Sequence, residues 1–338
     1  MSVDLLQPPT HLPPSTAVRV SQQAPRFLQS HSSTYLPYPL SLLTTSETQE
    51  TWQTYENLLL SCLRTGDDRS AHICLERLTQ RFGEKNERVL ALRGLYEEAT
   101  AESEEALEGV LRGYEALLQE DPTNMPIRKR RIALLRSMGR PADATVALVG
   151  LVDTSPTDAE AWSELADLYL TQSAYTQAVY CLEEVLLITP NAWNMHARLG
   201  EVIYISALST TSSTSTAAND GATMKALAES MRRFCRSIEL CANYLRGYYG
   251  LKLTTTRLLS LLPTTASKPP PAPSDPVVGD LAPPSLASVQ RLNELATAKL
   301  AEIVRRSAAG ERSWTGYETA EVIAARELLD RDTKGVER

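Results

Sequence analysis

At 338 residues, the chain is long enough for two ordinary domains or for one extended array of repeats. It is 43% hydrophobic, 22% charged and only 6% aromatic, an ordinary soluble composition whose long stretches of Ala, Leu, Glu and Arg favour helix over strand. The formal net charge of −7 argues against a protein whose main task is to grip nucleic acid.

Cysteine and histidine are scattered along the chain without the spacing of a chemical site. The five cysteines and four histidines form no C-x-x-C and no H-E-x-x-H pattern, and an odd, dispersed cysteine count is typical of reduced core thiols. His72 and Cys74, two residues apart, would point to different faces of one helix. We therefore expect no catalytic site, no metal site, no cofactor and no enzymatic activity.

No stretch of the sequence is typical of a membrane anchor. No apolar run approaches the ~18–20 residues that a spanning helix requires, and the start of the chain has no apolar signal segment. The sequence therefore predicts a cytosolic chain that something else must hold if it works at a membrane.

Residues 1–46 hold seven prolines and only three charged residues. Because proline fixes φ and cannot donate a backbone hydrogen bond, proline-rich segments favour extended structure. We predict an extended Pro/Ser-rich N-terminal arm that lies on the rest of the chain or on a partner.

The clearest internal repeat runs from Ala159 to Ala192. On a 34-residue template, eight of its residues stand where the tetratricopeptide pattern wants large, small or helix-ending residues. Small residues at positions 8 and 20 let two helices approach closely, large residues at 4, 7, 11 and 24 fill the space between helices, and proline at 32 ends the second helix. The eight residues are Trp162, Leu165, Ala166, Tyr169, Ala178, Leu182, Val185 and Pro190.

The same frame extends in both directions. Met125–Asp158 is another unit, the unit before it carries a four-residue insertion near 100–105, and a further unit begins near Trp52. The sequence thus predicts an all-α tetratricopeptide-repeat α-solenoid, a superhelix of about five antiparallel helix pairs, over residues 47–262. The glycines at position 8 of three of these units are Gly94, Gly200 and Gly250.

Segments of biased composition interrupt and follow the predicted helices. Residues 209–216 are all Ser or Thr, which predicts a disordered insertion over 209–222. Residues 263–284 hold eight prolines and predict a Pro-rich linker. Beyond it, apolar residues spaced along one helix face predict C-terminal capping helices at 285–330, followed by a charged tail at 331–338.

Charge is distributed unevenly along the chain. Residues 125–140 carry six basic residues and no acid, whereas residues 95–121 carry nine acids and a single Arg112. Two interpretations stay open: neighbouring units attract each other through opposite charge, or Lys129 and Arg136 face the concave groove and bind an acidic partner segment. RNA binding or nuclear import is disfavoured, because the run lies inside a predicted helix without interleaved aromatic residues.

Positions 2, 5 and 9 of each first helix are predicted to face the groove. The acids at position 9, Asp167 and Glu201, would repel a carboxylate, so the Lys/Asn/Arg clamp that holds a C-terminal carboxylate in chaperone-binding members of the superfamily is absent. For any one of these positions, ordinary solvated surface is the alternative. The candidate partner-binding residues are Lys129, Arg136, Glu160, Ser163, Asp167, Asn194 and Glu201.

Several runs outside the generic repeat positions resemble a specific family. They include the D-P-T-N turn at 121–124, the basic run from Arg128 and the C-L-E-E run from Cys181. With them, the chain is similar to subunit 2 of the endoplasmic reticulum (ER) membrane protein complex over roughly residues 47–260. It departs from that family in its proline-bearing N-terminus and in its three insertions.

The resemblance implies a peripheral, non-enzymatic scaffold subunit at the cytoplasmic face of the ER membrane. In that family the solenoid braces the cytosolic parts of membrane-spanning subunits and pairs with a second soluble subunit. The whole complex inserts tail-anchored and multi-spanning membrane proteins. A nucleic-acid partner is not expected. The alternative, from a different class, is a soluble tetratricopeptide adaptor that acts as a co-chaperone or an RNA-processing scaffold.

Overall fold

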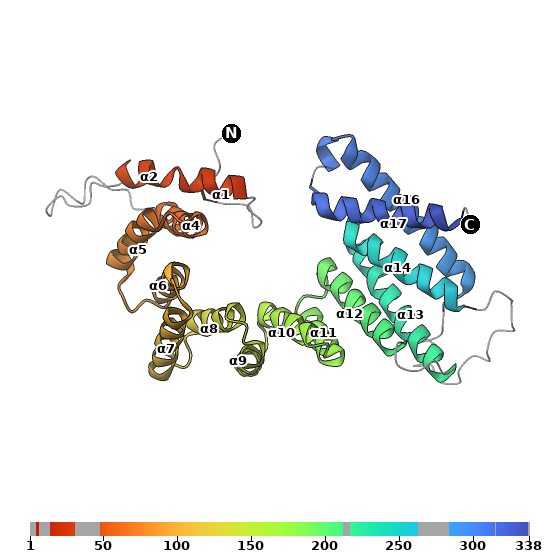
Figure 1. Ribbon diagram of the computed structural model, residues 1–338, viewed down its shortest axis with the longest axis horizontal. Helices are drawn as coiled ribbons and strands as arrows, with labels where there is room; N and C mark the ends of the chain where they lie inside the picture. The colour runs from red at the N-terminus through yellow and green to blue at the C-terminus, as the bar shows by residue number, and fades with distance from the viewer. Residues whose placement is uncertain are drawn as a thin grey trace. The chain divides into compact units, whose positions relative to one another are not determined.

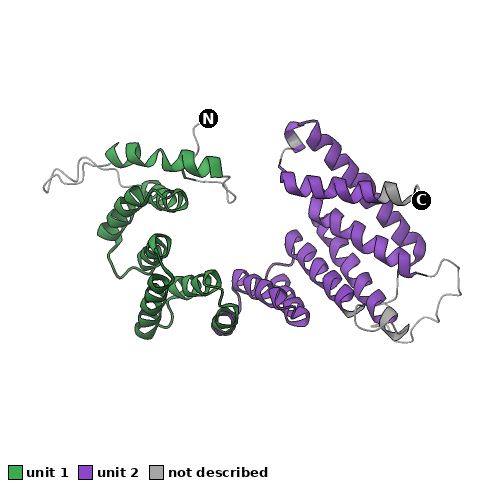
Figure 2. Cartoon of the chain, viewed as in Figure 1, with its two compact units in different colours: residues 1–147 green, residues 148–338 purple. Residues whose placement is uncertain are grey.

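The computed structural model describes residues 5–6, 14–30, 48–211, 217–262, 284–314 and 316–336. These residues form helices joined by short connections, and no strand occurs among them. The chain divides into two compact units, residues 1–147 and residues 148–338 (Figure 2). Each unit buries a hydrophobic cluster of its own.

The first unit contains the helices from α1 to α8 and the first half of α9 (Figure 1). α4 packs against α5, and α8 packs against both α6 and α7. The bounds are α1 Pro14–Ser21, α2 Ala24–Ser30, α4 Gln49–Thr65, α5 Asp68–Phe82, α6 Glu87–Thr100, α7 Glu104–Glu120, α8 Met125–Ser137 and α9 Pro141–Thr154.

The second unit contains the rest of α9 and the helices that follow it. α10 packs against α11, α12 against α13, and α14 against both α13 and α16, so that these helices lie side by side (Figure 1). The bounds are α10 Ala159–Thr171, α11 Tyr175–Ile188, α12 Trp193–Thr211, α13 Ala217–Leu240, α14 Leu245–Leu261, α16 Leu286–Ala308, the 3-10 turn η1 Arg312–Trp314 and α17 Thr319–Val336.

Side-chain caps fix the starting residue of many of these helices. In each case a side-chain oxygen accepts a hydrogen bond from a backbone N–H of the first turn, which otherwise has no partner inside the helix. At the other end of α4, Gly66 adopts a left-handed conformation with φ 73°, which glycine allows without strain. The capping residues are Thr48, Asp67, Asn86, Ser103, Asn124, Asp158 and Ser285.

Glycine at position 8 is what lets an aromatic ring pack between helices. A Cβ built on Gly250 would lie 2.1 Å from Phe234 Cε1, and one built on Gly200 would lie 3.1 Å from the Cε2 of the same ring. Phe234 is 3% exposed and stands at position 24 of its unit. In the first unit, Gly94 faces Tyr114 in the same way, with a Cβ-to-Oη distance of 2.1 Å.

The N-terminal segment is not a purely extended arm. Helices α1 and α2 lie within it, and Val20, Ala24 and Leu28 are buried in the cluster that α4 and α5 form. Their spacing of four residues puts these side chains on one helical face. Pro14 and Pro25 stand in the first turns of α1 and α2, where a missing N–H costs nothing.

The helices also extend further than the sequence predicts at two other places. α12 runs to Thr211 and α13 begins at Ala217, so helix enters the predicted insertion at 209–222 from both sides, and residues 212–216 lie outside the described residues. α17 runs to Val336, into the predicted tail. Of the predicted Pro-rich linker, residues 263–283 lie outside the described residues.

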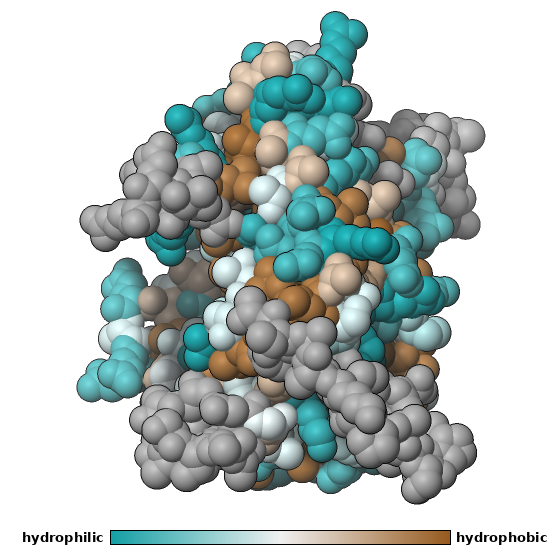
Figure 3. Space-filling view, turned by 90° about the vertical axis from the view of Figure 1, so that its right-hand side faces the viewer, coloured by the Kyte–Doolittle hydropathy of each residue, from teal (hydrophilic) through white to brown (hydrophobic). Residues whose placement is uncertain are grey.

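No described helix combines the length and the hydropathy needed to span a bilayer. Seen from the side of the C-terminal helices, the surface of the second unit alternates between hydrophobic and hydrophilic areas (Figure 3). The apolar side chains of this unit mostly point into its own cluster, which joins residues of α12, α13, α14, α16 and α17.

We expect Gly250→Ala to lower the free energy of unfolding by roughly 1–3 kcal/mol, because the added methyl group would clash with the Phe234 ring, whose other edge lies against Gly200. Gly113→Ala is the matched control, since nothing lies within 4 Å of the added methyl group and alanine favours helix by up to about 1 kcal/mol. Urea unfolding followed by circular dichroism measures both. If both variants raise the free energy of unfolding by the same amount, the close packing of the Phe234 ring against Gly250 is contradicted.

Three of the five cysteines, Cys62, Cys74 and Cys181, are buried, and the structure pairs none of the five in a disulfide. Burial raises the pKa of Cys62 and of Cys74 to about 12, and both side chains are fully buried. A raised thiol pKa means that the reactive thiolate is scarce at pH 8.

We therefore expect Cys62 and Cys74 to react with Ellman's reagent at pH 8 only after unfolding. Counting reactive thiols before and after addition of urea, with peptide mapping of the labelled sites, tests this expectation. Fast labelling of both residues in the folded chain would contradict it.

Candidate functional site

One hollow in the second unit collects four of the seven predicted groove residues. It has a volume of about 450 Å³ and lies among α10, α12, α13 and α14. We call it the α10–α14 hollow. Ser163 and Asp167 reach it from α10, and Asn194 and Glu201 reach it from α12. The template positions therefore identified residues from two successive first helices that meet in space.

An arginine joins the two predicted acids of this hollow. Arg198 donates from Nη2 to Asp167 Oδ1 and from Nη1 to Glu201 Oε2, each at 2.8 Å. Since one guanidinium faces two carboxylates, the trio carries a net charge of −1. Arg246, from α14, also lines the hollow and is held by Glu321 of α17 at 2.6 Å. The rim thus presents fixed charges of both signs.

Aromatic side chains line the rest of the hollow. Phe234, the ring enclosed by the two glycines, forms part of its lining, together with Tyr204, Tyr244 and Tyr249. Burial raises the pKa of Tyr204 and of Tyr244, so their hydroxyls stay protonated and able to donate at neutral pH. Leu253 adds an apolar contact surface. Aromatic residues and arginine are the types that carry most binding energy at protein interfaces.

Three predicted groove residues lie outside this hollow. Glu160 is exposed on α10, one turn before Ser163, and does not line it. Lys129 and Arg136 belong to α8 of the first unit, where Lys129 is half-buried and Arg136 is exposed. Their role as partner contacts stays a prediction.

Sequence reasoning missed the arginine and the aromatic residues of the hollow. Arg198 stands at position 6 of its unit, a position that was not expected to face the groove. Tyr204 stands at position 12, which was expected to face the groove only at Arg136 of the unit 125–158. Tyr249, at position 7, was expected to fill the space between helices. The signal was present at Arg198: a basic residue one turn before the acid at position 9, which is the spacing of an intrahelical ion pair.

In the first unit, the opposite-charge interpretation is confirmed for part of the basic run. Arg130 pairs with Glu98, Arg131 with Glu115 at 3.3 Å and Arg140 with Glu108 at 3.2 Å. Glu98 also accepts a hydrogen bond of 2.5 Å from the Tyr114 hydroxyl. Charges of α8 and of the turn that follows it are thus neutralised by acids of α6 and α7. The pairs join Arg130, Arg131 and Arg140 to Glu98, Glu115 and Glu108, respectively.

The described residues contain no group of three His, Cys, Asp or Glu side chains that could hold a metal ion. His196, at position 4 of its unit, is 8% exposed and its Nε2 lies 3.0 Å from the Pro190 carbonyl oxygen. His72 is exposed and lies against the Tyr96 ring, whereas Cys74 is buried. These two side chains occupy different faces of α5, as their spacing predicts.

Antiparallel helix pairs, with small residues at position 8 facing large ones at position 24, define a tetratricopeptide repeat protein. A family model described as the EMC2 TPR-like repeat domain matches residues 72–218. The TPR repeat protein oca3 of Schizosaccharomyces pombe is 35% identical over 212 residues, which cover 63% of this chain and 69% of that protein. The chain therefore belongs to the ER membrane protein complex subunit 2 family.

Relatives from other organisms carry that subunit name. ER membrane protein complex subunit 2 of Xenopus tropicalis is 32% identical over 209 residues, which cover 62% of this chain and 64% of the relative. Its counterpart in Saccharomyces cerevisiae is 27% identical over 212 residues, with 60% and 68% covered. The chain thus spans about two thirds of the length of the relatives that it matches.

Among solved structures, the C-terminal part of a TPR repeat-containing protein from Cytophaga hutchinsonii matches with a TM-score of 0.48 and 12% identity, over 89% of this chain and 95% of that chain. A tetratricopeptide repeat protein from Parabacteroides merdae matches with a TM-score of 0.39 and 17% identity, over 82% and 97%. Both likenesses are too distant to say anything about function.

We expect Glu98→Ala to lower the free energy of unfolding by roughly 1–3 kcal/mol, because it leaves the Arg130 guanidinium and the Tyr114 hydroxyl without their shared acceptor. The Glu98 and Arg130 side chains are only 13% and 27% exposed. Glu108→Ala is the control, since its pair with Arg140 is more than 40% exposed on both sides, and it should cost only about 0–1 kcal/mol. Urea unfolding compares them, and equal costs would contradict a structural role for Glu98.

Proposed function

We propose that this chain is a non-enzymatic scaffold subunit of an ER membrane protein complex. In this proposal it is a peripheral subunit on the cytoplasmic face of the ER membrane, and it braces the cytosolic parts of membrane-spanning subunits together with a second soluble subunit. The complex would insert tail-anchored and multi-spanning membrane proteins. Membership of the subunit 2 family supports the assignment to such a complex.

The observation that carries the proposal is the α10–α14 hollow. Its rim has fixed charges of both signs, and its lining includes one phenylalanine and three tyrosines. This combination suits a polypeptide segment that offers apolar side chains to the rings and polar groups to the rim. The charges are already paired within the chain, so they provide orientation for a partner more than attraction at long range.

A volume of about 450 Å³ accommodates a few side chains of a docking segment. Ser163 is small and half-buried at the wall of the hollow, so a large residue in its place would fill the space. Thr171 is exposed on the same helix, lies outside the hollow and is not among the predicted groove residues, which makes it a matched control position.

The test is affinity purification of tagged full-length chain from detergent-solubilised ER membranes. We expect wild type and Thr171→Arg to recover the same membrane-spanning partners in fixed stoichiometry. Ser163→Arg should reduce that recovery by about tenfold or more, the effect of losing a central contact at an interface. Thermal melting of both purified variants separates loss of binding from loss of folding.

Recovery of the wild-type chain only as a soluble monomer would overturn the proposal. Recovery with a chaperone or with RNA in place of membrane subunits would instead favour the soluble adaptor. Unchanged recovery with Ser163→Arg would leave the proposed membership of the complex standing, but it would contradict partner binding at the α10–α14 hollow.

A further inference from the structure

A second hollow lies in the first unit, among α4, α5 and α6, with a volume of about 570 Å³. We call it the α4–α6 hollow. Trp52 and Phe82 form an aromatic wall, with ring centroids 5.4 Å apart, and Phe82 is 45% exposed. Gln53 and Asn57 line it from α4, outside the part of the chain that the family model matches.

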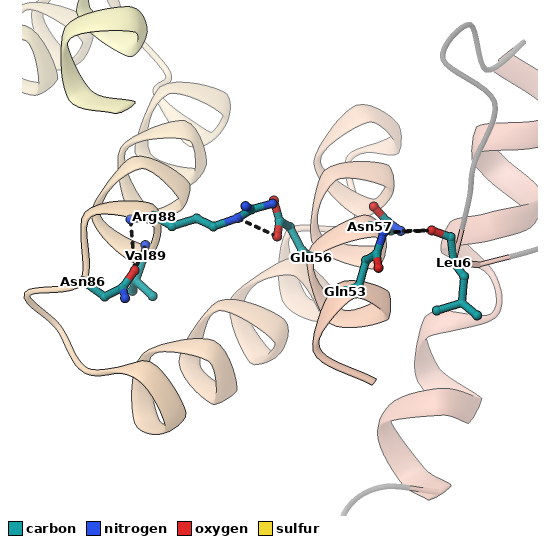
Figure 4. A network of polar contacts seen from close by, with 7 residues as sticks. All are labelled: Leu6, Gln53, Glu56, Asn57, Asn86, Arg88 and Val89. Carbon is teal, nitrogen blue, oxygen red and sulfur yellow. Dashed lines mark hydrogen bonds and ion pairs between the residues drawn. The ribbon is translucent and has the colours of Figure 1, made fainter. Parts of the chain in front are cut away.

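A polar frame holds this hollow in shape (Figure 4). Asn86 accepts from the backbone N–H groups of Arg88 and Val89 and so fixes the first turn of α6. From that turn, the Arg88 side chain reaches back to Glu56 of α4, with Nη2 2.7 Å from Oε1 and Nε 2.9 Å from Oε2. The bidentate pair ties α6 to α4 at the hollow.

Leu5 and Leu6 of the N-terminal segment are already bound at this place by their main chain. Asn57 Nδ2 donates to the Leu5 carbonyl at 2.9 Å. At the Leu6 carbonyl, Asn57 Nδ2 donates at 3.2 Å and Gln53 Nε2 at 3.3 Å (Figure 4). Among the described residues, neither amide makes another hydrogen bond. The Leu5 side chain packs against the hydrophobic cluster of the unit.

This arrangement binds a polypeptide through its backbone carbonyls and through one aliphatic side chain, the anchor, which here is that of Leu5. Backbone contacts of this kind accept different sequences, while the pocket for the anchor selects the side chain. The leucine pair does not exhaust the site, because the hollow beside it retains its volume, its exposed Phe82 ring and the Arg88 side chain, which is 73% exposed. A longer extended segment therefore has room and partners there.

We propose that the α4–α6 hollow binds an extended partner segment that carries a pair of aliphatic residues, and that Leu5–Leu6 compete for the same amides from within the chain. Gln53 and Asn57 hold the carbonyls of whichever segment is bound. Because the internal pair is tethered to the unit, its high effective concentration weakens every competing segment. The site is separate from the α10–α14 hollow and does not depend on the function proposed above.

The experiment uses a fluorescein-labelled peptide with the sequence of residues 1–10, titrated by fluorescence anisotropy into full-length protein. The first comparison is between wild type and the variant Leu5→Ser/Leu6→Ser, in which the internal competitor is weakened. We expect the variant to bind the peptide at least about tenfold more tightly than wild type does, since its Gln53 and Asn57 amides are available for a larger fraction of the time.

Two variants in the Leu5→Ser/Leu6→Ser background locate the binding. Asn57→Ala should weaken the peptide at least about tenfold, because it removes the amide that donates to both carbonyls. Gln80→Ala is the matched control: this amide is exposed on α5, bonds only Glu76 and does not line the hollow. It should leave the affinity unchanged. A peptide with Ser in place of both leucines should not bind.

Absence of saturable binding to the double variant would overturn the site, and equal affinity in wild type and double variant would overturn the competition. An Asn57→Ala variant that binds as well as Gln80→Ala would also overturn it. Thermal melting identifies variants that fail to fold. If the double variant does, Leu5→Ala alone replaces it, because Leu5 is the side chain that packs against the hydrophobic cluster.

Discussion

The ring of Phe234 fills the space between helices α12 and α14, and the packing of the second unit depends on the two glycines that admit it. With Gly200 and Gly250 on either side, the backbones of neighbouring first helices approach an aromatic ring more closely than any side chain would allow. The same ring lines the α10–α14 hollow. The constraint that holds the helices together therefore also sets the lining of the candidate site.

Ion pairs at the surface also join neighbouring repeats. Arg88–Glu56, Arg130–Glu98 and Arg140–Glu108 each join residues 32 apart, and Arg198–Asp167 joins residues 31 apart. These separations are close to one repeat of 34 residues. A basic residue of one repeat thus faces an acidic residue of the previous repeat. Most of these pairs are exposed and contribute little stability each, so their main effect is to orient neighbouring units.

Both hollows form where such a pair crosses between first helices. Arg88 reaches Glu56 at the α4–α6 hollow, and Arg198 reaches Asp167 at the α10–α14 hollow. In each hollow a guanidinium thus lies between two helices, beside aromatic side chains of the lining. The repeat geometry therefore generates hollows without any departure from the rules that stabilise the fold.

The sequence by itself determined the repeat frame, because spacing alone decides which residues share a helix face. Gly94, Gly200 and Gly250 at position 8 and Pro190 at position 32 mark that frame without any knowledge of contacts. It also placed Asp167 and Glu201 toward a groove, since residues 34 apart occupy equivalent positions.

Only the tertiary structure decided what those residues meet. The α10–α14 hollow combines side chains of helices up to about ninety residues apart, and no periodicity within one helix shows that Arg198, Tyr204 and Tyr249 converge there. The sequence did not predict the helices α1 and α2 for the same reason. Their prolines suggest extended structure, but the apolar face that stabilises these helices exists only once α4 and α5 have formed.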